Sequence, residues 1–121
     1  MEISAIRSAI CVTEDNPLLI EQAVKRMFTT ILEKNSLTEK DIAFILITQT
    51  GDLTSRNPAG ALRNAGFCQS VPLFCSQELE IKGMLEKVIR FLLVLKKDLK
   101  NPVHVYLDGA EKLRPDLALK K

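Results

Sequence analysis

The stretch KVIRFLLVL, residues 87–95, decides the fold of this chain, because its pattern fits both a helix and a strand. An apolar stripe at helical spacing runs over residues 84–93, while VIRFLLVL is also typical of a strand buried in a sheet. Within the stretch stands Arg90, whose guanidinium stays charged at any ordinary pH and is costly to bury without an anion. Two questions follow: whether the stretch is a strand, and which anion Arg90 meets.

The segments around this stretch have the patterns of strands separated by two helices. Apolar residues alternate or run together in the expected strands, at 2–12, 42–48, 71–75 and 103–107. The strand at 42–48 is uniformly apolar and is expected to be buried. Two helices are expected, at 17–34 and 58–66. Each begins at the proline of an Asn-Pro pair, which is typical of an asparagine cap with proline at the first helical position. A capped turn is expected at 38–41, and loops at 50–57 and 76–83.

This order of elements, β-α-β-α-β-β with a long first helix, predicts an α+β (α/β-type) fold with helices packed on a mixed sheet. The length of 121 residues predicts one domain over 1–121. Within it we expect an irregular C-terminal tail at 108–121, because Pro115 would break a helix there.

Composition and charge exclude several classes of function. The net charge is only +2, from 17 basic and 15 acidic residues, which is too balanced to indicate binding to nucleic acid or to an anionic membrane. The N-terminus lacks a basic leader with a long apolar run, so we expect no signal peptide, and the apolar runs are too short for a membrane span. The three cysteines form no CxxC pair, and with the single His104 they give no recognisable metal spacing. We expect a cytoplasmic, reduced protein that needs no metal.

Charged residues near apolar segments point to a small anion. The chain lacks the phosphate-binding, dinucleotide-binding, serine-hydrolase and zinc-protease motifs. His104 as a base and Cys75 as a nucleophile are weaker hypotheses than structural roles for both. Four arginines lie in or beside apolar segments, and arginine suits bidentate recognition of carboxylates: Arg7, Arg63, Arg90 and Arg114. Taken singly, each favours a salt bridge or a surface position, with Glu78 as a partner for Arg90, but together they suggest a ligand with more than one carboxylate.

Four segments carry a resemblance to a known family over essentially the whole chain. They are IRSAICVTEDNP, TGDLTSRNPAGALR, VPLFCSQELEIKGMLEKVIR and HVYLDGAEKLRPDL, in the family's order and near its spacing. On these segments the chain resembles the AroH class of chorismate mutases, the trimeric α/β type. The resemblance implies that 86–95 is a strand, that two helices cover one face of the sheet, and that three sheets join around a barrel-like core.

The resemblance also implies an activity and a site. The activity would be the Claisen [3,3] rearrangement of chorismate to prephenate, without cofactor or metal, in clefts between the subunits of a homotrimer. Arg90 would meet the ether oxygen and a carboxylate, Arg7 and Tyr106 would bind carboxylates, and Glu78 would accept the substrate hydroxyl. Arg90 and Glu78 would thus face different groups of the substrate rather than each other. Cys75 would be a hydrogen-bonding wall of the site. The other matching positions are Arg63, Asn57, Ala59, Gly60 and Phe74, together with Leu113 and Arg114 in a tail that would close over the substrate.

The sequence departs from the family at three places. The family's R-G-A-T is here Arg7-Ser8-Ala9-Ile10, Asn57 stands where an aromatic residue is frequent, and Gly60 stands where a lysine or another longer residue is found. Two alternatives therefore stay open: a non-catalytic trimeric module that binds chorismate or a related dicarboxylate, and an imine-hydrolysing deaminase on a similar trimeric fold.

Overall fold

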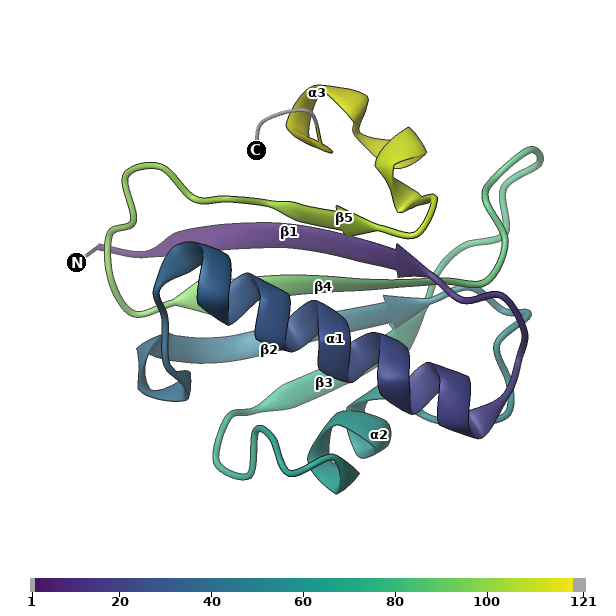
Figure 1. Cartoon of the computed structure of the whole chain (residues 1–121), viewed down its shortest axis with the longest axis horizontal. Helices are drawn as coiled ribbons and strands as arrows, with labels where there is room; N and C mark the ends of the chain where they lie inside the picture. Colours follow the sequence, from purple (N-terminus) through teal and green to yellow (C-terminus); the bar gives the residue numbers. More distant parts are fainter. Residues whose placement is uncertain (1, 119–121) are drawn as a thin grey trace.

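The structure, a computed structural model, describes residues 2–118. One mixed sheet holds five strands in the order β3-β2-β4-β1-β5, and helices α1 and α2 lie on one of its faces (Figure 1). The expected mixed sheet with two helices on one face is confirmed. The elements are β1 (Ser4–Cys11), α1 (Pro17–Asn35), η1 (Glu39–Asp41), β2 (Ile42–Gln49), α2 (Pro58–Asn64), β3 (Leu73–Gln77), β4 (Val88–Leu95), β5 (Val105–Leu107), η2 (Ala110–Leu113) and α3 (Pro115–Ala118).

The ambiguous stretch is the central strand of the sheet. β4 pairs antiparallel with both β1 and β2. A strand sends alternate residues to opposite faces, and here every second residue from Ile89 onward is buried beneath the helices. The prediction that 86–95 is a strand is confirmed over 88–95, while residues 86–87 form a bend before the strand, and the helical stripe was only a coincidence of spacing. Because this stretch and residues 105–107 are both strands, the observed order has one strand more than the expected β-α-β-α-β-β.

Several strand boundaries differ from the prediction, and hydrogen bonding explains the late starts of β3 and β5. β3 begins at Leu73 rather than 71, because Pro72 has no N–H and joins β2 only through its carbonyl, which accepts from the Ile45 N–H at 3.0 Å. β3 then continues to Gln77, into the expected loop. β5 begins only at Val105, which pairs with Ser8 of β1. One residue earlier, the Arg7 N–H donates to the His104 Nδ1 atom at 3.0 Å instead of to a backbone carbonyl.

Both helices begin where the Asn-Pro pairs predicted. The Asn16 Oδ1 atom accepts the N–H groups of Leu18 and Leu19 at the start of α1. The Asn57 Oδ1 atom accepts those of Ala59 and Gly60 at the start of α2. These caps satisfy main-chain donors that lack partners within the helix.

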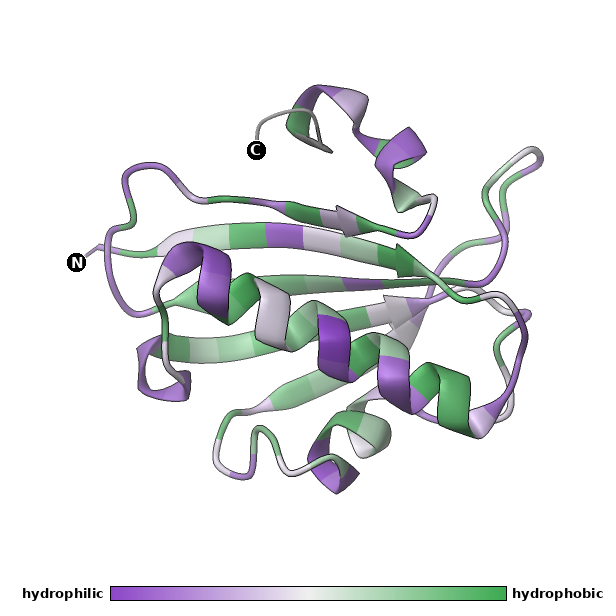
Figure 2. Ribbon diagram, in the orientation of Figure 1, coloured by the Kyte–Doolittle hydropathy of each residue, from purple (hydrophilic) through white to green (hydrophobic). Residues whose placement is uncertain are grey.

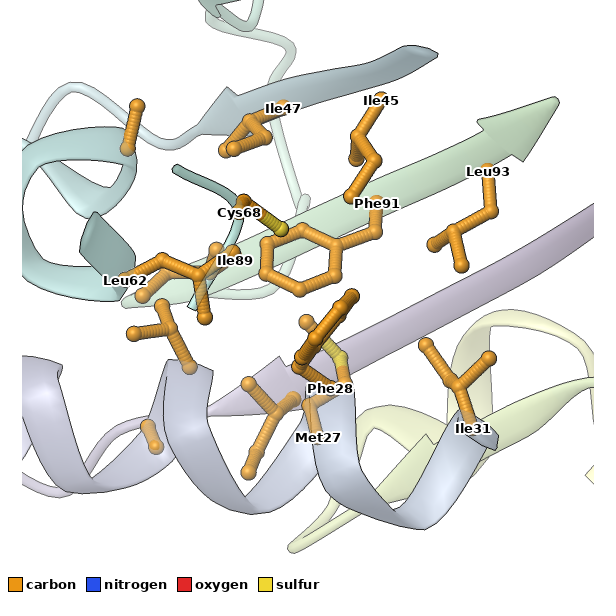
Figure 3. Close-up of a cluster of buried hydrophobic side chains, with 14 of the residues drawn as sticks. Met27, Phe28, Ile31, Ile45, Ile47, Leu62, Cys68, Ile89, Phe91 and Leu93 are labelled. Carbon is orange, nitrogen blue, oxygen red and sulfur yellow. The ribbon is translucent and has the colours of Figure 1, made fainter. Parts of the chain in front are cut away.

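The core lies between the helices and the sheet (Figure 3). Phe28 of α1 packs edge-to-face on Phe67, with ring centroids 5.4 Å apart. Burial of each large apolar side chain contributes about 1.5–3 kcal/mol, so this layer fixes which face of the sheet the helices cover. The labelled residues of the layer are Met27, Phe28, Ile31, Ile45, Ile47, Leu62, Cys68, Ile89, Phe91 and Leu93.

The opposite, helix-free face of the sheet is apolar but incompletely covered. Phe44, Leu46 and Phe74 are 38%, 40% and 68% exposed. The prediction that 42–48 is a fully buried strand is therefore wrong for the single chain: alternate residues of β2 point away from the helices. The strands are mostly hydrophobic, with short hydrophilic bands in β1 and β4 (Figure 2). Within residues 2–118, no helix is long and apolar enough to cross a membrane.

The tail is more ordered than the sequence suggested. Residues 110–113 form a 3-10 turn and residues 115–118 a helical turn, so the expectation of an irregular tail is wrong over these residues. Pro115 begins α3 instead of breaking a helix, because the first helical position needs no N–H partner. Ala110 and Leu113 pack with Ala9 and Tyr106, on one end of the helix-free face. The predicted tail also includes residues 119–121, which lie outside the described residues.

Candidate active site

A pocket of about 400 Å³ lies on the helix-free face, where side chains of neighbouring strands meet. Strand register explains the grouping: Arg90 on β4 stands opposite Ala9 on β1 and Thr48 on β2, and Ala9 stands opposite Tyr106 on β5. Its lining residues are Arg7, Ser8, Leu46, Thr48, Glu78, Arg90, Phe91, Leu92 and Tyr106. The structure thus brings Arg7, Glu78, Arg90 and Tyr106 to one place, from three strands and the loop after β3.

Arg90 and Glu78 are in direct contact. The Arg90 Nε atom lies 3.1 Å from the Glu78 Oε2 atom, so these two walls of the pocket also form an ion pair with each other. The sheet positions both residues. Arg90 lies on β4, and the Glu78 N–H donates to the Gln49 carbonyl at the end of β2, which holds the loop after β3 close to β4. Among the described residues, no hydrogen bond involves the terminal nitrogens of Arg90. These donors are therefore open to a ligand.

Tyr106 is surrounded by positive charge. Burial raises the pKa of its hydroxyl, and the nearby charges of Arg114, Arg90 and Arg7 oppose that shift. The raised pKa means that the hydroxyl is protonated at neutral pH and can donate to an anion. Arg114 is paired with Asp116 at 2.8 Å, whereas within residues 2–118 no ion pair involves Arg7. Two arginines with uncommitted donors and a phenol form a site suited to carboxylates.

A second group of expected site residues lies elsewhere, around α2 and β3. Cys75 stands opposite Ile47 and so points toward the core, not into the pocket. Its Sγ atom donates to the Asn57 Oδ1 atom at 3.5 Å. Burial raises the pKa of the Cys75 thiol despite the opposing effects of the Ala59 amide and the Arg63 charge, so it is a donor rather than a thiolate at neutral pH.

Within one chain, the two groups remain separate. Asn57 caps α2, Ala59 is buried in its first turn, and Gly60 and Arg63 are exposed along it. None of these residues lines the pocket with Arg90. Phe74 is different, because it lies on the helix-free face opposite Leu46, which lines the pocket. In the tail, Leu113 contacts the cluster around Tyr106, and Arg114 lies near its hydroxyl.

Sequence reasoning missed five lining residues, namely Ser8, Phe91 and Leu92 and, on β2, Leu46 and Thr48. The two residues of β2 lie on the same side of that strand, but only the register between β2 and β4 reveals that this is the side of Arg90. The sequence carried no signal for that register.

A larger pocket, of about 610 Å³, lies between the loop after β2 and the loop before β4. Acids and lysines alternate in its lining, with Asp52, Glu80 and Glu86 against Lys82 and Lys87. Such a lining favours a dianion less than the arginine-rich pocket does. In residues 2–118 no group of three or more His, Cys, Asp and Glu side chains is arranged to hold a metal ion.

Comparisons with known proteins agree on one family. The family model described as "Chorismate mutase type I" matches residues 3–117. The chain is 37% identical to "Chorismate mutase AroH" of Bacillus subtilis (strain 168), over 100% of this chain and 97% of that protein. It is 40% identical to "Chorismate mutase AroH" of Thermus thermophilus, over 95% and 96% of the two chains. A solved chorismate mutase from Clostridium thermocellum superposes with a TM-score of 0.83 at 39% identity, covering 90% of this chain and 98% of that one.

Proposed function

Because the chain belongs to the type I chorismate mutase family, we propose that it converts chorismate to prephenate in the pocket that contains Arg90. The observation that carries this function is the position of Arg90, mid-strand but with its terminal nitrogens uncommitted, beside Glu78, Tyr106 and Arg7. The product is an intermediate in the biosynthesis of phenylalanine and tyrosine.

The chemistry of the reaction matches these side chains. Chorismate carries two carboxylates, an ether oxygen and a hydroxyl. As its C–O bond breaks, negative charge gathers on the ether oxygen, and a fixed cation there binds the transition state better than the substrate. We assign this role to Arg90. A millionfold rate gain needs roughly 8 kcal/mol, and one well-placed donor contributes about 3–4 kcal/mol. Restraint of the substrate in its compact conformation would supply much of the rest.

The remaining pocket residues recognise the ground-state groups. Arg7 and the Tyr106 hydroxyl bind carboxylates, since both are donors on the same face as Arg90. Glu78 accepts the substrate hydroxyl through the oxygen that Arg90 does not contact. Leu113 and Arg114, already beside Tyr106, close the pocket from the tail.

The working enzyme is a homotrimer in this proposal. The exposed apolar side chains of Phe44, Leu46 and Phe74 support it, because a monomer rarely leaves such a face uncovered. The separation of the second group also supports it: Asn57, Ala59, Gly60, Arg63 and Cys75 would complete the pocket of a neighbouring subunit. The three cysteines are all free thiols, which is consistent with a reducing cytoplasm.

The two alternative functions have less support. The names of the relatives describe catalysts rather than binding modules, and none describes a deaminase. A chorismate-binding module would still share the fold and the arginines, so catalysis itself must be measured.

The test is loss of the ultraviolet diene absorbance of chorismate on addition of the purified protein. We expect turnover by the wild type and a loss of at least about 10²–10³-fold in kcat for Arg90→Ala. Arg90→Lys keeps the charge but not the planar fork, and we expect it to recover only part of the rate. Size-exclusion mass should be that of a trimer for all three proteins. Binding of chorismate without any turnover by the wild type would favour the non-catalytic module.

A further inference from the structure

We propose that Thr48 is a positioning residue of the active site. It prevents the two carboxylate oxygens of Glu78 from contacting Arg90 at the same time. This inference rests on the function proposed above. It concerns a side chain to which neither the sequence patterns nor the family resemblance gave a role.

The geometry around Glu78 is specific. The Thr48 Oγ1 atom donates to the Glu78 Oε2 atom at 2.6 Å, and the Arg90 Nε atom contacts the same oxygen at 3.1 Å. The Glu78 side chain is only 17% exposed whereas that of Arg90 is 46% exposed, so the hydrogen bond from Thr48 is the better sheltered of the two contacts. Thr48 stands directly opposite Arg90 in the β2–β4 pairing, so its hydroxyl and the Arg90 Nε atom approach the same carboxylate oxygen from neighbouring strands.

The Thr48 hydrogen bond and the Arg90 ion-pair contact both fall on Oε2, and within residues 2–118 no hydrogen bond involves Oε1, which leaves that oxygen for another partner. An arginine and a carboxylate without other contacts tend to form a fork-to-fork pair, in which two N–H groups contact both oxygens. That arrangement would consume a terminal nitrogen of Arg90 and the second oxygen of Glu78. Both are needed in the proposed reaction, the first for the ether oxygen and the second for the substrate hydroxyl. The Thr48 hydroxyl binds Oε2 and so stabilises the single-contact geometry instead.

Threonine is suited to this task by its shape. Its β-branched side chain has few rotamers in a strand, so the hydroxyl is held in one direction. A hydrogen bond to a charged group is also stronger than one between neutral groups. The hydroxyl can therefore compete with an N–H of Arg90 for the carboxylate.

Kinetics of three variants test the role. Thr48→Val removes the hydroxyl at nearly constant volume, and we expect kcat/KM for chorismate to fall about tenfold or more. Thr48→Ser keeps the hydroxyl, and we expect it to restore the rate to within about threefold of wild type. Thr29→Val is the matched control, because within residues 2–118 the Thr29 hydroxyl bonds only to carbonyls of its own helix. Equal losses for Thr48→Val and Thr48→Ser would overturn the proposal.

A double-mutant cycle shows whether Thr48 acts through Glu78. In the Glu78→Ala background, the change Thr48→Val should cost less than about twofold, because the group that it positions is gone. The same loss with and without Glu78 would mean that Thr48 acts in another way, and would overturn the proposal.

A structural comparison separates this proposal from the proposed function. If the wild type does not turn over chorismate, the function fails, but crystal structures of the ligand-free wild type and Thr48→Val still test the contact. We expect one Arg90–Glu78 contact in the wild type and a two-contact pair in Thr48→Val. An unchanged carboxylate in the variant would overturn the role of Thr48 whatever the activity.

Discussion

Arg90 answers the question of how a charge can stand within an apolar strand. Its neighbours Ile89 and Phe91 point into the core, while its own side chain points to the helix-free face and is 46% exposed. The charge is therefore never buried without a partner. An ion pair at such a position is typically worth no more than about 1 kcal/mol, so the contact with Glu78 does little for stability. The value of Arg90 lies in its remaining donors.

Cys75 should act as a hydrogen-bond donor and not as a nucleophile. Because burial raises the pKa of its thiol, little thiolate exists at neutral pH. Cys75→Ser keeps a donor within reach of the Asn57 Oδ1 atom, and we expect kcat/KM in the chorismate assay to stay within about tenfold of wild type. Cys75→Val removes the donor and should cost more. A loss of several orders of magnitude for Cys75→Ser would indicate covalent catalysis instead.

At the scale of elements, one carboxylate ties the loop before α2 to the loop before α1. Asp15 accepts hydrogen bonds from the Thr54 N–H, the Thr54 hydroxyl and the Ser55 N–H at 2.9–3.1 Å. Hydrogen bonds from the Ser55 side chain and then from the Ser55 and Thr54 main chain lower the pKa of Asp15 from 3.8 to about 2. A carboxyl whose pKa is lower in the folded state stabilises the fold above its unfolded pKa, and that stabilisation is lost as the pH falls from 3.8 to about 2.

Asp15→Asn should therefore lower the melting temperature at pH 7 but not at pH 2. Calorimetry of both proteins at equal concentration, at several pH values between 2 and 7, checks this. Glu14→Gln is the control, because among the described residues Glu14 has no such hydrogen bonds, and its melting curves should follow those of the wild type. A melting difference for Asp15→Asn that is as large at pH 2 as at pH 7 would contradict the assignment.

Sequence patterns within single segments predicted most helices and strands. The remaining features depend on contacts between segments that are distant in the sequence. The Asn-Pro caps and the apolar stripe of α1 lie within one segment, so the sequence displays them directly. The start of β3 depends on the pairing of Pro72 with β2 through its carbonyl alone, and the turns of the tail depend on packing against Ala9 and Tyr106. Likewise, Arg7, Arg90 and Tyr106 were expected as site residues from resemblance, but the contact between Arg90 and Glu78 and the place of Thr48 required the sheet register.

At the scale of the whole molecule, the expected site residues of one chain lie in two groups on different surfaces. The arginine-rich pocket lies on the helix-free face, while α2 and the core side of β3 carry the second group. Phe74 lies between them, on the edge strand and largely exposed. In a closed ring, each subunit gives one surface to one neighbour and the other surface to the next. Such a ring would join the pocket of each chain to the α2–β3 surface of another.

Subunit mixing tests this arrangement. Arg90→Ala removes the cation of the pocket, and Arg63→Glu places a negative charge on the α2 surface, so each homotrimer should be nearly inactive. After the two variants are unfolded together in equal amounts and refolded, about a quarter of the interfaces should combine an intact pocket with an intact α2 surface. We therefore expect about a quarter of the wild-type chorismate mutase rate to return. The double variant Arg63→Glu/Arg90→Ala, mixed with Arg90→Ala, is the control and should stay inactive. If the mixture of single variants also stays inactive although mass spectrometry finds mixed trimers, each site must be contained in one chain.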